Sequence, residues 1–145
     1  MEKIAIVTGS SSGIGFETAL ALAREGYFTY ATMRDTKKEN NIKETAKKEN
    51  LKLEVLAMDV DKEDSVRNTI NRIVKEKGRI NILVNNAGYG LFGCLEDITM
   101  EDLKAQFETN FFGVVRVSQA VIPVMRKQKS GIIINVSSVA GRIGF

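Results

Sequence analysis

The chain has 145 residues, of which 43% are hydrophobic and 27% charged, a composition ordinary for one globular domain. Its formal net charge is only +3 and the charges are interleaved, so nothing indicates a nucleic-acid partner. No apolar run is long enough to cross a membrane, and we expect a cytoplasmic protein. With no histidine and a single cysteine, Cys94, an internal disulfide and a Ser-His-Asp triad are excluded, and no metal site is expected.

Apolar runs typical of buried strands alternate along the chain with helical patterns. In chain order we expect a strand at 4–7, a helix at 14–25, a strand at 27–33, a helix at 36–50, a strand at 53–58, a helix between Asp61 and Gly78, a strand at 80–84, a long helix between Thr99 and Gly131, and a strand at 132–136. This alternation predicts a Rossmann-like α/β fold, a doubly wound parallel sheet in three αβα layers. We expect one domain over 1–145.

Residue types near the helix ends predict how several helices begin and stop. Gly26 is expected just past the end of the first helix, and Asp61 is expected to cap the third. Thr99 with Asp102 resembles a capping box at the start of the long helix. The apolar side of that helix is expected to carry Leu103, Phe107, Phe111, Val114, Ser118, Ile122 and Met125.

A glycine-rich turn, Thr8-Gly9-Ser10-Ser11-Ser12-Gly13-Ile14-Gly15, follows the first strand directly and opens a helix. Closely spaced glycines let backbone N–H groups approach a ligand, and the start of a helix suits a phosphate. The spacing is G-x-x-x-G-x-G rather than the common G-x-G-x-x-G, because position 18 is Thr18. Taken alone, the turn is compatible with a phosphate site or with a plain tight turn.

Ligands of a doubly wound sheet bind beyond the carboxyl ends of the strands, and distinctive residues follow every predicted strand. After the glycine turn come Arg34-Asp35, Asp59-Val60, Asn85-Asn86-Ala87-Gly88 and Ser137-Ser138. Each has a structural alternative: a turn cap for Asp59, loop asparagines at 85 and 86, a satisfied buried amide at Asn110, and a strand terminus at the serines. Because such residues follow all five predicted strands at the same edge of the sheet, we favour a ligand site there.

The chain resembles the classical short-chain dehydrogenase/reductase family over essentially its whole length. The matching residues are T-G-S-S-S-G-I-G at 8–15, D-V at 59–60, N-N-A-G at 85–88, Asn110, and I-N-V-S-S at 134–138. The resemblance implies NAD(P)-dependent oxidation of an alcohol or reduction of a carbonyl. The alternative is a dinucleotide-binding module without chemistry, such as a redox sensor or a pseudoenzyme.

The resemblance also implies a role for each matching residue. The expected cofactor contacts are Gly9, Ser10, Ser12, Gly13, Ile14 and Gly15 on the pyrophosphate side, Asp59 and Val60 at the adenine, and Asn86, Ala87 and Gly88 near the ribose. Ser138 is expected to hydrogen-bond the substrate oxygen, and Asn110 to hold a water in the proton relay. Strand alternation lets only one serine of the pair at 137 and 138 face the substrate.

The residues after the second strand predict the choice between NAD and NADP. The family's acidic position falls on Met33, which cannot bind a ribose hydroxyl, and Arg34 follows it. A guanidinium there would bind a 2′-phosphate, so we expect NADP rather than NAD. Asp35 lies at the general spacing of a ribose-binding acid, but we expect it to face solvent or to pair with Arg34 or Lys37.

The family's catalytic Y-x-x-x-K is not formed by any tyrosine of this chain. Four residues beyond Tyr27, Tyr30 and Tyr89 stand Ala31, Arg34 and Gly93. We expect 1–145 to be the N-terminal, cofactor-binding half of an enzyme, without the family's C-terminal strands and helices, and inactive by itself. The apolar run at 132–136 is typical of a strand covered on both faces, so this stretch alone is expected to aggregate or melt early.

Apolar residues after the fourth strand indicate the kind of substrate. Tyr89, Leu91, Phe92 and Cys94 are expected to border the pocket, which favours a small hydrophobic alcohol or ketone. This stretch is similar to hydroxysteroid and retinol dehydrogenases. The resemblance implies a homo-oligomer built partly on the long helix, although the apolar side of that helix suits an intrachain core equally well.

Overall fold

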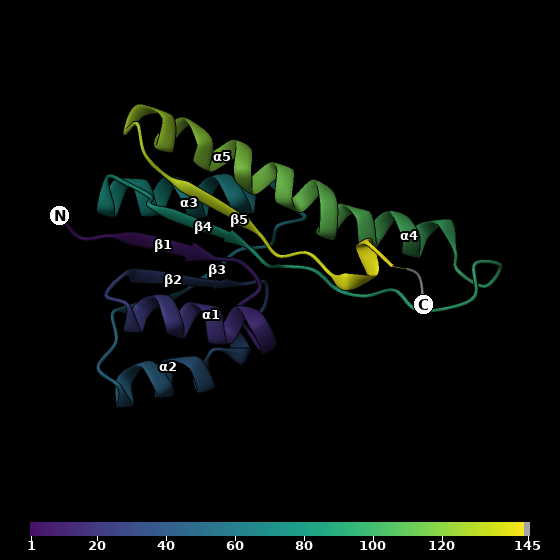
Figure 1. The fold of residues 1–145 in the computed structure, drawn as a ribbon, viewed down its shortest axis with the longest axis horizontal. Helices are drawn as coiled ribbons and strands as arrows, with labels where there is room; N and C mark the ends of the chain where they lie inside the picture. The colour runs from purple at the N-terminus through teal and green to yellow at the C-terminus, as the bar shows by residue number, and fades with distance from the viewer. Residues whose placement is uncertain (144–145) are drawn as a thin grey trace.

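The computed structural model describes residues 1–143, which form a parallel five-stranded sheet with helices on both faces (Figure 1). In chain order the main elements are β1 (Ile4–Val7), α1 (Gly13–Arg24), β2 (Phe28–Met33), α2 (Asn40–Lys48), β3 (Leu53–Ala57), α3 (Glu63–Lys77), β4 (Ile82–Asn85), α4 (Met100–Phe107), α5 (Gly113–Lys127) and β5 (Ile132–Asn135). The predicted doubly wound α/β fold is confirmed, and the strand boundaries differ from prediction by two residues or fewer.

The strand order β3-β2-β1-β4-β5 explains where a ligand can bind. From β1 the chain builds outward through β2 to β3, then crosses back to add β4 and β5 on the other side. The connections from β1 and β4 therefore leave the sheet in opposite directions, and a crevice opens between them at the carboxyl ends of the strands.

Two hydrophobic cores, one on each face, hold the helices to the sheet. Side chains alternate along β1, so Ile4 and Ile6 belong to one core while Ala5 and Val7 belong to the other. The first core takes in apolar residues of α3 and α5, and the second those of α1 and α2. All four β1 residues are at most 1% exposed, which is why this strand reads as a continuous apolar run.

The charged segment predicted as one helix over 36–50 is two pieces. A short 3-10 turn covers Thr36–Lys38, and α2 begins only at Asn40. The carboxylate of Asp35 accepts a hydrogen bond from the backbone N–H of Lys37 at 3.0 Å, which fixes the first turn separately. The helix that remains buries only Ile42 and Ala46, so little packing energy is available to extend it.

The predicted cap of the third helix is wrong. Lys62, not Asp61, occupies the N-cap position of α3, and the Asp61 carboxylate instead accepts a hydrogen bond from the Thr109 hydroxyl at 3.0 Å. Two other end predictions are confirmed. Gly78 ends α3 with a left-handed φ of 71°, and Thr99 Oγ1 accepts the Asp102 N–H at 3.0 Å.

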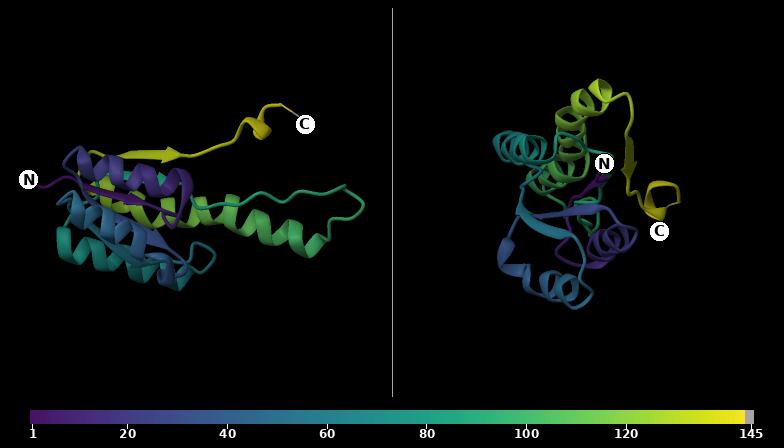
Figure 2. Two further views of the ribbon diagram at one scale, coloured as in Figure 1. Left: turned by 90° about the horizontal axis from the view of Figure 1, so that it is seen from below. Right: turned by 90° about the vertical axis from the view of Figure 1, so that its left-hand side faces the viewer.

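The long predicted helix contains a π-helical turn, Glu108–Phe112, between α4 and α5. A π turn inserts one extra residue, so the buried face changes across it. The buried stripe of α5 is Gly113, Val117, Val121 and Met125, whereas Phe107, Phe111 and Ile122 are exposed. The predicted apolar side is therefore wrong at Phe107, Phe111 and Ile122, whereas Met125 is buried and Leu103, Val114 and Ser118 are half-buried. Figures 1 and 2 show α4 extending beyond the end of the sheet, where no strand lies beneath it.

Gly131 does not close the long helix. The helix ends at Lys127, and Lys129 takes the left-handed conformation, with a φ of 54°. Gly131 instead permits close packing, because a Cβ at this position would overlap the side chain of Met125.

The last strand, β5, is covered on one face only within residues 1–143. Ile133 packs against the core, whereas Ile132 is 57% exposed and Ile134 45% exposed. β5 pairs with β4 and forms the edge of the sheet. This exposure agrees with the expectation that the apolar run lacks a cover in the described part of the chain.

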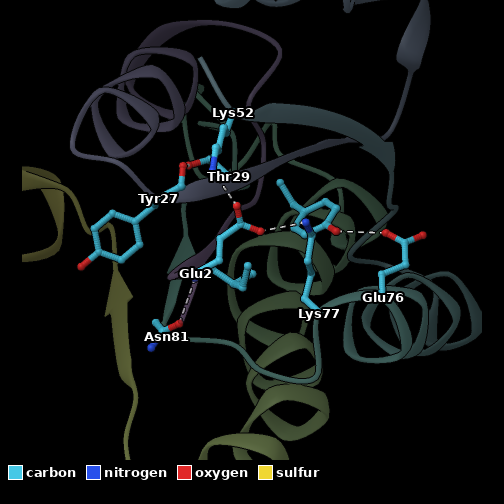
Figure 3. A network of polar contacts seen from close by, with 9 residues as sticks. Glu2, Tyr27, Thr29, Lys52, Glu76, Lys77 and Asn81 are labelled. Atoms are coloured by element: carbon cyan, nitrogen blue, oxygen red, sulfur yellow. Dashed lines mark hydrogen bonds and ion pairs between the residues drawn. The ribbon is translucent and has the colours of Figure 1, made fainter. Parts of the chain in front are cut away.

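A polar network joins the amino ends of β1–β3 to α3, at the opposite end of the sheet from the glycine turn (Figure 3). Glu2 accepts hydrogen bonds from Lys52 and Lys77, each at 3.0 Å, and Tyr30 donates to Glu76 at 3.0 Å. The two lysines lower the pKa of Glu2. Burial, followed by the bond to Glu76, raises the pKa of Tyr30.

Across residues 1–143, every helix is too short or too polar to span a bilayer. The same part of the chain brings together no group of three acidic, cysteine or histidine side chains that could bind a metal ion.

Candidate functional site

A cleft of about 450 Å³ opens at the carboxyl ends of the strands, between the loops that follow β1 and β4. Nine of the predicted cofactor residues line it: Gly9, Ser12, Ile14, Arg34, Asp59, Val60, Asn86, Ala87 and Gly88. Ser11, Met33, Met58, Asp61, Tyr89 and Thr109 complete the lining. Asp61 and Thr109 belong to this lining although nothing in their sequence positions predicts a contact with a ligand, except that Thr109 directly precedes Asn110.

Close backbone contacts shape the glycine turn. A Cβ on Gly9, whose φ is +67°, would lie 2.7 Å from the Cα of Ala87. A Cβ on Gly15 would overlap the carbonyl oxygen of Gly9 and the side-chain nitrogen of Asn86. The turn can therefore approach the loop after β4 only because these positions lack side chains.

The side chain of Asn86 fastens the turn to the loop after β4. Asn86 Nδ2 donates to the carbonyl oxygens of Thr8 and Gly9, at 3.0 and 3.1 Å. In return, Thr8 Oγ1 accepts the backbone N–H groups of Asn86 and Ala87, both at 2.9 Å. These bonds hold two sides of the cleft at a fixed distance. Asn86 therefore has a structural function here, and its side chain still borders the cleft.

The start of α1 presents backbone donors to the cleft. Ser12 occupies the N-cap position, and within residues 1–143 its hydroxyl makes no capping bond. The first N–H groups of α1 have no partner within the helix, and the helix dipole adds a partial positive charge. Ile14 is 65% exposed beside this turn. The arrangement fits a phosphate or diphosphate group with an apolar group nearby.

Ser10 lies in the same turn but points away from the cleft. It is fully buried, and its hydroxyl donates to the carbonyl oxygen of Val7 at 2.9 Å. The Ser10 side chain therefore stabilises the end of β1, which departs from the expectation that it contacts a cofactor.

The two charges after β2 differ in their surroundings. Arg34 is exposed and lines the cleft, whereas Asp35 begins the adjacent 3-10 turn through its bond to the Lys37 backbone. Met33 is 2% exposed. At this point a cation, rather than a carboxylate, borders the cleft.

The loop after β3 is held by its own polar groups. The backbone N–H of Asp59 donates to Ser65 Oγ at 2.9 Å, and Asp59 Oδ1 accepts the N–H of Asp61 at 3.1 Å. Asp59 therefore caps a turn and borders the cleft at once. Val60 is 7% exposed and presents an apolar surface there.

Asn110 lies in the π-helical turn and binds the backbone of Tyr89. Its Oδ1 accepts the Tyr89 N–H at 3.0 Å, and its Nδ2 donates to the Tyr89 carbonyl at 2.8 Å. A Cβ on Gly88 would lie 3.1 Å from Asn110 Oδ1. Both ends of the amide are therefore satisfied, and Asn110 fixes the loop that follows the N-N-A-G segment.

Ser138 follows β5 and lies outside the lining of the cleft. It occupies the N-cap position of a short turn, Val139–Gly141, where its Oγ accepts the N–H of Ala140 at 3.2 Å.

The buried Asn85 joins the ends of β4 and β5. Its Nδ2 donates to Asn135 Oδ1 at 2.9 Å and to Ser118 Oγ at 3.1 Å.

Comparison with known proteins gives consistent relationships. A model of the short chain dehydrogenase family matches residues 3–145. The chain is 43% identical over 142 residues to 3-ketodihydrosphingosine reductase of Bacteroides thetaiotaomicron, a match covering 98% of this chain and 49% of that protein. It is 43% identical over 147 residues to retinol dehydrogenase 8 of Bos taurus, covering 98% of this chain and 46% of that protein.

A solved structure shows the same fold. The crystal structure of a metagenomic short-chain oxidoreductase in complex with NADP matches with a TM-score of 0.92 at 31% identity, over 99% of this chain and 65% of that one. The chain spans about half the length of the curated relatives it matches.

Proposed function

We propose that this chain, which belongs to the short-chain dehydrogenase family, carries the cofactor-binding part of an NADP-dependent oxidoreductase. The reaction would interconvert an alcohol and a carbonyl compound. The observation that carries the choice of NADP is the exposed Arg34 at the cleft, beside an Asp35 already engaged by backbone. The NADP bound to the metagenomic relative agrees with this choice.

The residues at the cleft fit a dinucleotide. The Gly9–Gly15 turn and the start of α1 would hold the diphosphate through backbone N–H groups, with Ser12 beside it. We call the part of the cleft bordered by Asp59 and Val60 the adenine end. Arg34 would bind the 2′-phosphate. Gly13 and Ile14 belong to the turn at the diphosphate, and Asn86, Ala87 and Gly88 would border the ribose.

The chemistry follows from what each component supplies. A nicotinamide cofactor, when bound, provides or accepts the hydride. Ser138 would donate a hydrogen bond to the substrate oxygen, and Asn110 would hold the loop of Tyr89 and a water for proton transfer. The proton itself needs a general acid or base, and residues 1–145 contain no Y-x-x-x-K. We therefore propose that this domain works with residues outside it.

The substrate we propose is a small hydrophobic alcohol or ketone. Tyr89 is 46% exposed and Phe92 is 92% exposed in the loop after β4, where they present apolar surface. Two relatives are named for 3-ketodihydrosphingosine and for retinol, which supports a hydrophobic substrate.

We also propose a homo-oligomer, supported by the exposed Phe107 and Phe112 on the long helix. Cys94, as the single cysteine, favours the reducing cytoplasm.

Turnover by the intact protein tests this function. NADPH oxidation is followed with a panel of hydrophobic ketones, for the natural protein and for Ser138→Ala. Because a positioned hydrogen-bond donor is worth roughly 10²–10³-fold in turnover, Ser138→Ala should lower kcat by about that factor. Ser137→Ala is the matched control and should keep the natural rate.

The oxidoreductase and the non-catalytic sensor are expected to give different results in this assay. Tight NADPH binding without oxidation by any ketone, in the intact protein, would support the non-catalytic sensor. Equal losses in the two serine variants would contradict the role of Ser138.

A further inference from the structure

The π-helical turn contacts the loops that follow two different strands. Asn110 binds the backbone of Tyr89 in the loop after β4. The two residues before it, Glu108 and Thr109, are linked to the loop after β3. Single π turns within α-helices are rare and frequently occur at functional sites. One turn of helix therefore connects the adenine end of the cleft with the Asn110–Tyr89 pair.

Arg116 of α5 makes the first link. Its Nη1 donates to the carbonyl oxygen of Val60 at 2.5 Å, and its Nη2 bonds Glu108 Oε1 at 2.5 Å. The Arg116 side chain is 22% exposed, so these charge-assisted bonds are partly shielded from water. A single guanidinium thus fixes the position of the Val60 carbonyl relative to the π-helical turn.

Thr109 makes the second link. Its Oγ1 donates to Asp61 Oδ2 at 3.0 Å, and both residues line the cleft. The other carboxylate oxygen, Asp61 Oδ1, is buried without a hydrogen-bond partner among residues 1–143. An unsatisfied buried oxygen is unfavourable, so a small shift of this loop that gives Oδ1 a partner would be stabilised.

Packing reinforces the two polar links. A Cβ on Gly113, the residue that begins α5, would lie 2.9 Å from Val60 Cγ2. The backbone at the start of α5 therefore packs directly against the Val60 side chain. A movement of one requires a movement of the other, because close-packed contacts leave no gap to absorb it.

We propose that Arg116 and Thr109 are positioning residues through which occupation of the adenine end fixes the Asn110–Tyr89 pair. The inference rests on the proposed function, since it takes Asp59 and Val60 as the adenine contacts. A ligand that immobilises the Val60 loop also immobilises Arg116, and with it the turn that carries Asn110. The cofactor's distal end would thereby organise the loop beside the reacting groups.

Hydrogen exchange of the intact protein tests the link. The probe is ADP, which carries the adenosine and diphosphate common to NAD and NADP, and calorimetry confirms that each variant is saturated. In the natural protein ADP should slow exchange of the Tyr89 amide by at least about fivefold, the lower end of typical coupling between sites. In Arg116→Gln this slowing should be lost, although every residue that lines the cleft is unchanged.

Two controls separate coupling from a structural effect. Arg126→Gln removes an exposed arginine from the same helix and should keep the slowing at Tyr89. Thr109→Val, which keeps the shape of threonine but not its hydroxyl, should reduce the slowing, and Thr109→Ser should retain it. If Arg116→Gln fails to fold, the comparison of Thr109→Val with Thr109→Ser still tests the coupling between the adenine end and Tyr89.

The outcomes distinguish the coupling from the function on which it rests. Equal slowing at Tyr89 in the natural protein, Arg116→Gln and Thr109→Val, all saturated with ADP, would overturn the coupling and leave the proposed function standing. Failure of the natural protein to bind ADP would overturn both.

Discussion

The neighbouring charges Arg34 and Asp35 show how one hydrogen bond decides which of two adjacent side chains can contact a ligand. Either residue could contact a ribose from its place in the chain. Asp35 instead accepts the backbone N–H of Lys37, and Arg34 alone of the two borders the cleft. The sequence left open whether Asp35 faces solvent or pairs with a neighbour, because spacing does not determine which way a side chain turns.

Arg34→Ala is the substitution that should change cofactor preference. A hydrogen bond to a charged group is worth about 1.5–3 kcal/mol. At 1.4 kcal/mol per decade, NADPH should bind the natural protein roughly ten- to a hundredfold more tightly than NADH. Arg34→Ala should remove that difference by weakening NADPH alone. Cofactor fluorescence titrations of the intact protein measure both affinities.

Lys38→Ala provides the charge-matched control for Arg34→Ala. It removes a nearby exposed cation that does not line the cleft, so the preference for NADPH should persist. Equal affinities for NADPH and NADH in the natural protein would contradict the assignment of Arg34.

Asp61 shows why some residues of the site could not be predicted. Aspartate is a good N-cap, so local preference placed it at the start of a helix. In the structure it bonds Thr109, which is 48 positions away in the chain. A contact between residues so far apart leaves no local pattern in a sequence. Ser10 shows a different limit, because its hydroxyl bonds a carbonyl only three residues back, at Val7, and a serine in a glycine-rich turn could equally face a ligand.

At the scale of elements, the long helix was predicted to exist but its buried face was not. Its start at Thr99 and Asp102 is a local signal, and the structure confirms the cap: Thr99 Oγ1 accepts the Asp102 N–H and donates to the Asp102 carboxylate. The π-helical turn Glu108–Phe112 then shifts the buried side to the stripe of Val117 and Val121. A prediction from regular helical spacing assumes that the same face stays buried along the whole helix. It therefore assigns the wrong face to the helix on one side of the π-helical turn.

The polar network at the amino ends of the strands predicts a loss of stability in acid. Lys52 and Lys77 lower the pKa of Glu2, while Arg72 and then Tyr30 lower that of Glu76. A carboxyl whose pKa is depressed by folding stabilises the folded state above its unfolded pKa, and this contribution is lost as pH falls through the folded pKa. The free energy of unfolding should therefore decline below about pH 4.3, the ordinary pKa of glutamate.

Denaturant unfolding of the intact protein across pH 3 to 7, at constant ionic strength, measures this effect. Glu2→Gln should lower stability at neutral pH and flatten the decline in acid, because the titrating group is gone. Glu25→Gln, at an exposed glutamate, should change neither. An acid profile that Glu2→Gln leaves unaltered would show that the network does not contribute.

At the scale of the whole molecule, the alternation of strands and helices was enough to predict the architecture. That alternation indicated a parallel sheet with helices on both faces, and the residues after each strand indicated a ligand site at one edge of the sheet. Strand order did not follow from the sequence, because it depends on which strands pair across long connections. The pairing of β4 with β1 at Val7 and Val84 brings the glycine turn against the loop after β4 and so forms the cleft.

The uncovered face of β5 predicts how residues 1–145 behave when expressed alone. Ile132, Ile134 and Val136 are 57%, 45% and 39% exposed. Leaving even two of these three side chains in water forgoes about 3–6 kcal/mol of burial, a large part of a typical stability of about 5–15 kcal/mol. We expect this stretch either to self-associate, which sedimentation would show, or to have a low melting temperature, which calorimetry would show. A monomer with one cooperative, high-temperature transition would contradict this.

The central claim is that the cleft at the strand ends binds NADP, and a crystal structure of the intact protein with NADPH tests it most directly. We predict the diphosphate against the Gly9–Gly15 turn, the adenine beside Asp59 and Val60, and the 2′-phosphate on Arg34. A dinucleotide bound elsewhere, or a 2′-phosphate that points away from Arg34 into solvent, would contradict the account.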